Sequence, residues 1–441
     1  MAWDVVIVGG GFAGAAAART LERTLPRQSA RLTLVNDVNF LLYTPFLPEA
    51  AAGTLEPRHV VTPLREILRR TELRLGGVGD HDPGARTVGL NTHAGGREEL
   101  RYDQLLVTVG SVSRSLPIPG LERHAIGFKS LADAIWLRNH VIETLETANA
   151  TEDPSRRAAL LTYVFVGGGY SGLEALAELQ DFAADAIERY PRARLHGMRW
   201  ILVEALDRVL PEVDLDLAAY AVRELRGRGI DVRLGTRLEE ARERSVALST
   251  GEQIATETLV WTAGVAPHPS LAALGLPLDE RGRVEVDEFM AVRGLEGVWA
   301  AGDCAAVPDP AKRRAGACPP TAQHAVRQGP VVAHNIAAAL GAAEGRRRFE
   351  YAAKAAFVNL GRYKAVGKLG RLSVRGFLAW WMARTYHMSQ IPGLARKVRA
   401  VADWTVGLPF ARDTAEVGSI GHPRPLSDQA YLRGGTHRPL D

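Results

Sequence analysis

Residues 3–14 read WDVVIVGGGFAG and residues 161–172 read LTYVFVGGGYSG, so one pattern appears twice, 158 positions apart. In each copy an apolar run typical of a buried strand leads into a glycine turn, and an Ala- or Leu-rich helical segment follows. A further apolar strand comes next, at residues 31–35 in the first copy and 199–203 in the second. Two complete strand–turn–helix–strand units predict an α/β fold with two Rossmann-like dinucleotide-binding domains.

The glycine turns have the spacing that holds a dinucleotide. In this pattern the first glycine makes a tight turn, the second lets the pyrophosphate approach the backbone, and the third lets the helix pack on the strand. The helix N-terminus then faces the phosphate charge. A glycine turn after an apolar strand also occurs for steric reasons alone, but the strands and helices around both copies favour cofactor binding. The residues expected at the first site are Gly9, Gly11, Phe12, Ala13 and Gly14, and those at the second are Gly167, Gly169, Tyr170, Ser171 and Gly172.

The residue that ends the following strand is expected to bind a ribose, and the two sites differ there. The second site has Glu204, whose carboxylate binds ribose hydroxyls and repels a 2′-phosphate, so it favours NADH over NADPH. The first site has Asn36, followed by Asp37, where an acidic residue is usual. An asparagine can still donate and accept hydrogen bonds, and Asn36 also fits an ordinary turn residue, so both interpretations stay open.

The composition is that of an ordinary globular protein. With 441 residues, 46% of them hydrophobic and 24% charged, the chain is long enough for about three domains. Two cysteines, Cys304 and Cys318, exclude a disulfide framework and favour a reducing, cytosolic compartment, and each is expected to be a small core residue. The chain shows no signal-peptide pattern, and no run of ~20 apolar residues predicts a membrane span. The histidines lack metal-binding spacing, so no metal is expected.

Basic charge is concentrated near the C-terminus. Residues 371–412 hold seven Arg or Lys and one acid, Asp403, which is a local charge of +6 in a chain whose net charge is +4. The same segment holds three of the eight tryptophans and shows no nucleic-acid-binding motif. An anionic membrane surface is therefore expected as its partner, and nucleic acid is not.

The basic segment also predicts two amphipathic helices, interrupted at residues 391–393. One apolar stripe holds Phe377, Trp380, Trp381 and Met388, and the other holds Leu394, Val398, Val401 and Thr405. Arg396 and Arg399 lie opposite the second stripe, whereas Arg384 falls on the first, where it would have to extend toward lipid phosphates. The residues expected at the membrane are Trp380, Trp381, Arg384, Arg396, Arg399 and Trp404. Two alternatives stay open for the same stripes: packing on the protein body and packing in a dimer interface.

Three further apolar strands end in glycine or aspartate where the chain leaves or re-enters a nucleotide domain. They read LVTVG over residues 106–110, LVWTAG over 259–264 and GVWAAGD over 297–303. A strand that returns to the first domain after the second resembles the two-dinucleotide-binding-domain flavoproteins. The resemblance implies that Asp303 contacts the FAD ribityl and phosphate region. It also implies FAD contacts at Gly110 and Gly302 and NADH contacts at Ala263 and Gly264.

Among these flavoproteins the chain resembles type II NADH dehydrogenase, a single-subunit NADH:quinone oxidoreductase that pumps no protons, over nearly its whole length. The motifs are Tyr43-Thr44-Pro45 within residues 40–53, Phe128-Lys129-Ser130-Leu131 with Asp133-Ala134, a long helix from Glu178 to Tyr190, and Pro319-Pro320-Thr321-Ala322-Gln323. The resemblance implies FAD as cofactor, NADH as co-substrate and a membrane quinone as acceptor. It also implies that Thr44 and Pro45 bind FAD, and that Ala322 and Gln323 lie at the flavin ring and line the quinone pocket.

Two side chains, Gln323 and Glu174, are expected to take part in catalysis. The run Pro-Pro-Thr before Ala322 is a good helix start, and a helix N-terminus there would stabilise a reduced, anionic flavin. Glu174 lies two residues after the second glycine turn, and the resemblance puts it near both nicotinamide and flavin, where it affects hydride transfer or protonation. The plainer alternatives are an exposed helix residue for Gln323 and a helix-dipole contact for Glu174. The neighbouring His324 is expected to face away.

The sequence therefore predicts a discontinuous FAD domain (1–112 and 270–345), an inserted NADH domain (113–269), a membrane or dimer segment (346–420) and a disordered tail (421–441). The predicted enzyme passes a hydride from NADH to FAD and two electrons onward to a quinone, as a peripheral protein on the cytoplasmic side of the cell membrane. A homodimer is left open. The lack of a redox cysteine pair disfavours disulfide and sulfide substrates. Two alternatives are kept: a soluble NADH-dependent flavin reductase with another acceptor, and a flavin- and NADH-binding signalling protein.

Overall fold

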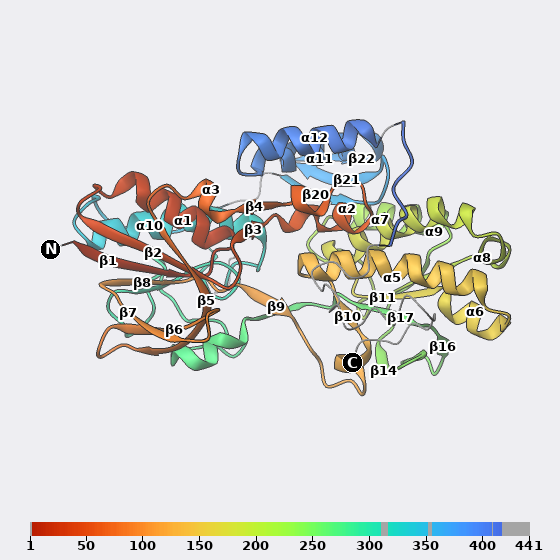
Figure 1. Ribbon diagram of the computed structural model, residues 1–441, viewed down its shortest axis with the longest axis horizontal. Helices are drawn as coiled ribbons and strands as arrows, with labels where there is room; N and C mark the ends of the chain where they lie inside the picture. The colour runs from red at the N-terminus through yellow and green to blue at the C-terminus, as the bar shows by residue number, and fades with distance from the viewer. Residues whose placement is uncertain (1, 310–315, 352–354, 408, 417–441) are drawn as a thin grey trace, which may run out of the picture.

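The computed structural model describes residues 2–309, 316–351, 355–407 and 409–416. They form two lobes, each built on a parallel sheet, and a C-terminal layer of strands and helices lies over the junction between them (Figure 1). The tail expected at 421–441 lies outside the described residues.

The first sheet is built around the first glycine turn. Among the described residues it has seven strands, in the order β19-β8-β1-β2-β5-β6-β7, and the five from β19 to β5 run parallel. These strands are β1 (Trp3–Val8), β2 (Ala30–Asn36), β5 (Glu72–Asp82), β6 (Thr87–Thr92), β7 (Arg97–Arg101), β8 (Gln104–Val107) and β19 (Val298–Ala300). Residues 5–8 of β1 are fully buried, because a central parallel strand is covered on both faces.

Two long helices pack together on this sheet, α1 (Phe12–Thr24) and α10 (Ala322–Ala339). Four buried alanines on α1 keep its side chains short, so the helix can lie close to the sheet and to α10. Smaller elements follow in this part of the chain: β3 (Phe40–Leu42), η1 (Thr44–Phe46), η2 (Pro57–His59), β4 (Val61–Pro63), α3 (Leu64–Ile67) and η4 (Pro269–Leu274). Between them, α2 (Leu47–Ala51) packs on helices α5 (Leu131–Ala150) and α7 (Tyr170–Ala186) of the second lobe.

The second sheet is built around the second glycine turn. Its five parallel strands, among the residues described, follow the order β10-β17-β11-β12-β13. They are β10 (Ile126–Gly127), β11 (Thr162–Val166), β12 (Arg199–Val203), β13 (Asp231–Arg233) and β17 (Thr258–Trp261). An antiparallel sheet covers one face, with β14 (Leu238–Arg242), β15 (Ser245–Leu248) and β16 (Gln253–Ala255).

The helices of the second lobe are α4 (Leu121–His124), α5 (Leu131–Ala150), α6 (Pro154–Leu160), α7 (Tyr170–Ala186), η3 (Ile187–Arg189), α8 (Pro191–His196) and α9 (Leu215–Gly227). The long helix expected over 178–190 therefore starts earlier, directly at the glycine turn, and changes to a 3-10 turn after residue 186. The proline at position 191 follows that turn, which explains why the α-helical geometry does not continue.

The chain passes between the lobes along two short strands, β9 (Ser111–Ser113) and β18 (Val265–Pro267), which pair antiparallel. After them, β19 returns to the first sheet beside β8. This discontinuous arrangement of two dinucleotide-binding units confirms the predicted α/β fold class. The residue boundaries assigned to the domains stay a prediction.

The C-terminal layer consists of an antiparallel sheet and two helices. The sheet has β20 (Ala355–Asn359), β21 (Ala365–Leu369) and β22 (Leu372–Arg375), and α11 (Gly376–Gln390) and α12 (Leu394–Val406) follow. Two helices separated at residues 391–393 agree with the sequence prediction. Within the described residues, no helix combines the length and the apolar character that crossing a bilayer requires.

Candidate active site

The first glycine turn connects β1 to α1. Gly9 has a φ of +100°, and a Cβ there would collide with the carbonyl oxygen of Thr108, so only glycine fits. A Cβ at Gly14 would collide with the carbonyl oxygen of Gly9. At Gly11, in contrast, an added Cβ meets no atom within 4 Å, and no side chain caps the helix that follows. The start of α1 therefore has no side-chain cap and has room beside Gly11, as a pyrophosphate site requires.

The second turn, between β11 and α7, repeats this geometry. Gly167 has a φ of +115° and lies against the backbone of Thr262 and Ala263, and a Cβ at Gly172 would collide with the carbonyl oxygen of Gly167. At Gly169 an added Cβ again meets nothing within 4 Å, and α7 has no side-chain cap. Both turns thus have the close approaches and the open helix start that a dinucleotide needs.

The residues that end β2 and β12 make the same contact in their two sites. Asn36 Oδ1 accepts a hydrogen bond from Gly10 N at 2.7 Å, and Glu204 Oε2 accepts one from Gly168 N at 2.5 Å. The Asn36 amide also donates to Val38 O at 2.7 Å. Asn36 is therefore tied to the glycine turn itself, beyond the role of an ordinary turn residue. A neutral amide takes the position in the first site that a carboxylate takes in the second.

The ends of β8 and β19 bring Asp303 to the same edge of the first sheet as the first turn, since parallel strands share their carboxyl edge. Ser111 donates its hydroxyl hydrogen bond to Asp303 Oδ2 at 2.7 Å, and Lys129 Nζ lies 3.8 Å from the same oxygen. Gly302 N donates to Gln328 Oε1 of α10 at 2.7 Å. Sequence reasoning did not assign a role to Ser111 or Lys129, although Lys129 belongs to a motif that carried the family resemblance.

A pocket lies where α1, α10 and α11 meet. Its wall includes Phe12, Tyr43, Pro45, Ala322, Gln323, Arg327 and His387. The structure thus gathers these residues from four separate parts of the sequence, including four residues that were expected at the flavin. Thr44 lies between two of these residues, in η1.

Gln323 is held at both ends of its amide. Its Nε2 donates to Ala355 O at 3.2 Å, and Tyr351 donates its hydroxyl hydrogen bond to Gln323 Oε1 at 3.1 Å. Thr321 caps α10, as expected from the Pro-Pro-Thr run. A side chain fixed in this way does not fit the alternative of a freely exposed helix residue.

Tyr43 and His387 form a second polar pair in the pocket wall. Tyr43 Oη lies 3.2 Å from His387 Nδ1. Burial lowers the pKa of His387 to about 4 and raises the pKa of Tyr43 above its ordinary value, so both are neutral at neutral pH. The two residues are 344 positions apart in the sequence, and no local pattern pairs them.

Glu174 lies on α7 just after the second glycine turn. Its Oε1 accepts a hydrogen bond from Asn359 N of β20 at 2.9 Å. Burial and the neighbouring carboxylates of Glu49 and Glu178 raise the pKa of Glu174 to about 8. The side chain is bound to the C-terminal sheet and tends to hold a proton at neutral pH, which differs from a simple helix-dipole contact.

The two cysteines are both buried, as expected for core residues. Burial raises the pKa of the Cys304 thiol to about 12, so its thiolate is scarce at neutral pH. His324 is bonded to Thr321 and packs against Tyr351.

Three residues expected at the membrane pack against the protein body instead: Trp380 is buried, and Arg384 and Trp404 are partly buried. The Arg384 side chain is 12% exposed, its guanidinium lies 4.1 Å from the Trp380 ring centre and 4.9 Å from that of Trp404, and its Nε lies 3.5 Å from Glu49 Oε1. Trp404 donates to Glu49 Oε2 at 2.8 Å. The expectation that Arg384 extends outward from an exposed stripe is wrong, because a distant segment supplies a buried carboxylate for it.

The remaining membrane candidates lie on α11 and α12, and they differ in whether their side chains face the protein or solvent. Arg396 points inward, toward Glu66 Oε1 at 3.6 Å and Arg58 O at 3.0 Å. Leu394 and Val398 are 78% and 60% exposed, and Val401, Thr405 and Arg399 are exposed with them. On α11, Phe377 and Trp381 are exposed while Trp380 is buried. The second apolar stripe is thus free of the protein body along its length.

Comparison with known proteins identifies the class of this fold and site. The sequence profile of the pyridine nucleotide-disulphide oxidoreductases matches residues 3–329, and the chain belongs to this family. Its curated relatives include the type II NADH:quinone oxidoreductase Ndh of Mycobacterium tuberculosis, which is 29% identical over 420 residues, 91% of this chain and 87% of that protein. The type II NADH:quinone oxidoreductase of Staphylococcus aureus is 27% identical over 385 residues, 86% of this chain and 93% of that protein.

A solved structure has the same fold over almost the whole chain. NDH2 from Plasmodium falciparum in complex with NADH superposes with a TM-score of 0.86, over 94% of this chain and 100% of that chain, at 16% identity. The relatives confirm the resemblance to type II NADH dehydrogenase that the sequence motifs indicated. The assignment of individual site residues stays a prediction.

Proposed function

We propose that this chain is an FAD-dependent NADH:quinone oxidoreductase. The observation that carries the proposal is the pocket at the start of α10, which places Gln323 beside residues of the first dinucleotide site such as Phe12 and Pro45. The relatives named above have the same activity in their names. The second dinucleotide site supplies a place for the electron donor, and the pocket supplies a place for the acceptor.

The residues of the first site fit FAD. The uncapped start of α1 offers N–H groups to a pyrophosphate, and Asn36 borders the turn where an adenosine ribose would lie. Asp303, fixed by Ser111 and Lys129, would accept hydrogen bonds from ribityl hydroxyls. The proposed set is Gly9, Gly11, Phe12, Ala13, Gly14, Asn36, Thr44, Pro45, Gly110, Gly302, Asp303, Ala322 and Gln323. When bound, FAD accepts a hydride from NADH and passes two electrons to a quinone.

The residues of the second site fit NADH. The carboxylate of Glu204 would repel the 2′-phosphate of NADPH, and the free start of α7 would bind the pyrophosphate. Glu174 lies on the next turn of that helix and would donate a hydrogen bond or a proton near the reacting rings. The proposed set is Gly167, Gly169, Tyr170, Ser171, Gly172, Glu174, Glu204, Ala263 and Gly264.

The pocket wall fits a quinone ring. Most of the wall is apolar, and the Gln323 amide and the Tyr43–His387 pair provide hydrogen-bonding groups for the two carbonyl oxygens. The Arg327 guanidinium lies 4.4 Å from the Tyr351 ring centre, so its charge borders the pocket. These side chains would orient the acceptor and shield it from bulk water.

We also propose that the exposed stripe of α12, with Phe377 and Trp381 of α11, contacts an anionic membrane on the cytoplasmic side. A lipid-soluble acceptor has to enter from the bilayer, and the exposed cation of Arg399 suits lipid headgroups. A homodimer that covers the same stripe is the competing arrangement. Vesicle flotation with and without anionic lipid tests the membrane contact, and the molecular mass of the protein in solution tests the homodimer.

The test of the proposed function is NADH oxidation by the purified, FAD-loaded protein with a panel of soluble quinones. We expect quinone-dependent turnover with NADH and much weaker turnover with NADPH. A variant without residues 371–441 that keeps full activity, but only with a non-quinone acceptor, would favour the soluble reductase. Slow oxidation of the reduced flavin by every quinone would favour the signalling protein.

A further inference from the structure

Glu174, which is partly buried, lies in a group of three carboxyl groups with the buried Glu178 and Glu49. Glu178 follows Glu174 by one turn of α7, so both side chains leave the same face of the helix, and Glu178 is 1% exposed. Glu49 of α2, which packs on α7, is the third. Burial raises the pKa of both Glu174 and Glu178, and the charge of Glu49 raises each of them further. Two carboxyl groups on one helix face therefore hold protons easily.

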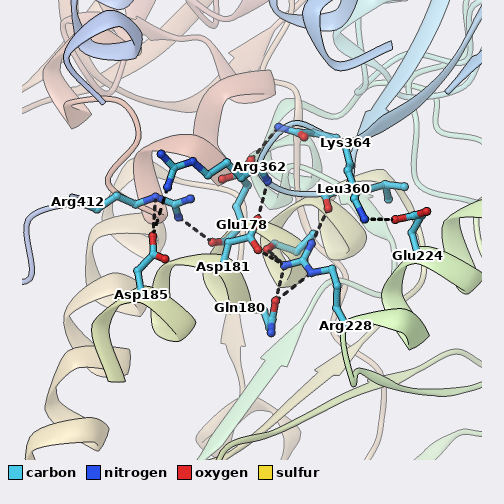
Figure 2. Close-up of polar contacts among 12 residues, drawn as sticks. Glu178, Gln180, Asp181, Asp185, Glu224, Arg228, Leu360, Arg362, Lys364 and Arg412 are labelled. Carbon is cyan, nitrogen blue, oxygen red and sulfur yellow. Dashed lines mark hydrogen bonds and ion pairs between the residues drawn. The ribbon is translucent and has the colours of Figure 1, made fainter. Parts of the chain in front are cut away.

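Two buried arginines face these three carboxylates. Arg384 lies 3.5 Å from Glu49, and Arg412, whose side chain is 8% exposed, donates to the main-chain oxygen of Glu178 at 3.4 Å. Figure 2 shows Arg412 reaching toward α7 beside Glu178 and Asp185. Both arginines lower the pKa of Glu178, opposing the effect of burial. Arg412 also lies 3.9 Å from Asp185, so its charge is shared, and the three carboxyl groups outnumber the cations that face them.

Other charges near the cluster are already paired. Asp181 lies 2.6 Å from Arg228, which also donates to Leu360 O at 2.5 Å (Figure 2). The charged and titratable groups that face Glu174 and Glu178 are Glu49, Tyr170, Asp181, Arg384 and Arg412. The excess of carboxyl groups over cations favours a proton on Glu174 or Glu178, because burial raises the pKa of both.

Asn359, the last residue of β20, connects the two glutamates. Its main-chain N–H donates to Glu174 Oε1 at 2.9 Å, and its side-chain Nδ2 donates to Glu178 Oε1 at 2.9 Å. Its Oδ1 is buried and has no hydrogen-bond partner among the described residues. A protonated carboxyl group is a donor, so this free acceptor suits the protonated form of Glu178, which the same amide already contacts. The main-chain N–H of Asn359 holds Glu174 beside it.

A cavity of about 1100 Å³ adjoins the cluster, and Glu178, Arg384 and Arg412 are in its wall. The cavity has polar groups and ample room for water. It is separate from the pocket at Gln323, whose lining residues it does not share. Glu178 therefore lies between a water-accessible space and Glu174.

We propose that Glu178 carries protons from this cavity to Glu174, with Asn359 positioning both carboxyl groups. The inference rests on the proposed function. NADH supplies two electrons and one proton as hydride, and the quinone needs two electrons and two protons, so one proton per turnover comes from water. Glu174 gives its proton to the quinone as the quinone takes up two electrons, Glu178 reprotonates Glu174, and water in the cavity reprotonates Glu178. The proton enters on the α7 side, away from the quinone pocket.

The first test is an infrared pH titration of the full-length, FAD-loaded protein, which follows the carbonyl stretch of protonated carboxyl groups without turnover. The wild-type protein should show a carboxyl group that titrates near neutral pH. In Glu178→Gln the remaining group should titrate at lower pH, because the negative neighbour that raised the pKa of Glu174 is gone. The control Glu188→Gln removes a carboxylate on η3 that pairs with Arg194, and it should change nothing.

The second test is the pH profile of quinone turnover in the same variants. Turnover of the wild type should fall as pH rises and the two glutamates lose their protons. Glu178→Gln should lower turnover about tenfold and move its fall to lower pH, because the pKa of Glu174 is lowered, and Glu178→Asp should restore most of the turnover. Reduction of the bound flavin by NADH should change by less than about twofold in both variants. If Glu178→Gln does not fold, Asn359→Leu takes its place in the turnover measurement, where loss of the hydrogen bond to Glu178 should also lower turnover while flavin reduction changes by less than about twofold.

Unchanged titration and an unchanged pH profile in Glu178→Gln would overturn the relay. Slow flavin reduction in Glu178→Gln would also overturn it, because the defect would then lie in the NADH step. Failure of the wild-type protein to reduce any quinone would overturn the proposed function instead, while the infrared titration would still report on the carboxyl cluster.

Discussion

Replacing Arg384 by methionine tests the internal position of the C-terminal helices. The guanidinium is held between two indole rings and beside the buried carboxylate of Glu49. Breaking a buried ion pair from one side costs about 3–5 kcal/mol, because the remaining charge stays buried. Methionine fills the space between the rings, and Trp404 keeps its hydrogen bond to Glu49. We therefore expect a loss of stability at the low end of this range, about 3 kcal/mol.

A decrease of about 3 kcal/mol in the free energy of local opening makes amide exchange in α11 and α12 about a hundredfold faster. Native-state hydrogen exchange at a fixed FAD concentration measures this directly. The double variant Arg384→Met with Glu49→Gln removes both charges, and exchange should return to within about 1 kcal/mol of the wild type. Arg399→Met removes an exposed cation from α12 and should leave exchange unchanged while weakening binding to anionic vesicles. The reasoning is refuted if Arg384→Met leaves exchange unchanged and weakens vesicle binding as Arg399→Met does.

Five further variants probe the cofactor and acceptor sites. Glu204→Ala should lower kcat/KM for NADH about tenfold and raise the ratio of kcat/KM for NADPH to that for NADH. Steady-state kinetics with both cofactors measures this ratio, and an unchanged ratio would contradict the ribose assignment. Asn36→Asp keeps the acceptor for Gly10 N and should retain FAD, whereas Asn36→Leu should weaken FAD binding about tenfold in a fluorescence titration. Gln323→Ala and His387→Asn should raise the KM for quinone about tenfold and leave flavin reduction by NADH within about twofold in stopped-flow experiments; equal losses in both steps would argue against a quinone pocket there.

The glycine turns and their strands could be predicted because their signals are local. A buried strand, three glycines at fixed spacing and an alanine-rich helix are neighbours in sequence as well as in space, and β1, α1, β11 and α7 lie where these patterns indicated. The carboxyl edge of a parallel sheet then brings Gly110 and Asp303 to the first turn, so a long separation in sequence was no obstacle. The contact of Asn36 with Gly10 also follows from the equivalent position of Glu204.

The contacts of the C-terminal layer could not be predicted, because they join segments that share no repeat. Arg384 looked like an exposed cation on an apolar stripe until Glu49, more than 300 positions earlier in the sequence, supplied its buried partner. The pair of Tyr43 with His387 and the bridge made by Asn359 arise in the same way. The amphipathic pattern of α12 gave the correct exposed stripe but could not tell whether a membrane or a second copy covers it.

The most direct measurement of the central claim is a two-step anaerobic stopped-flow experiment on the full-length, FAD-loaded protein. NADH should bleach the flavin absorbance in the first step, and a quinone added in the second step should restore it fast enough to account for steady-state turnover. Reduction by NADH followed by no faster reoxidation with quinone than with buffer would contradict the assignment of an NADH:quinone oxidoreductase.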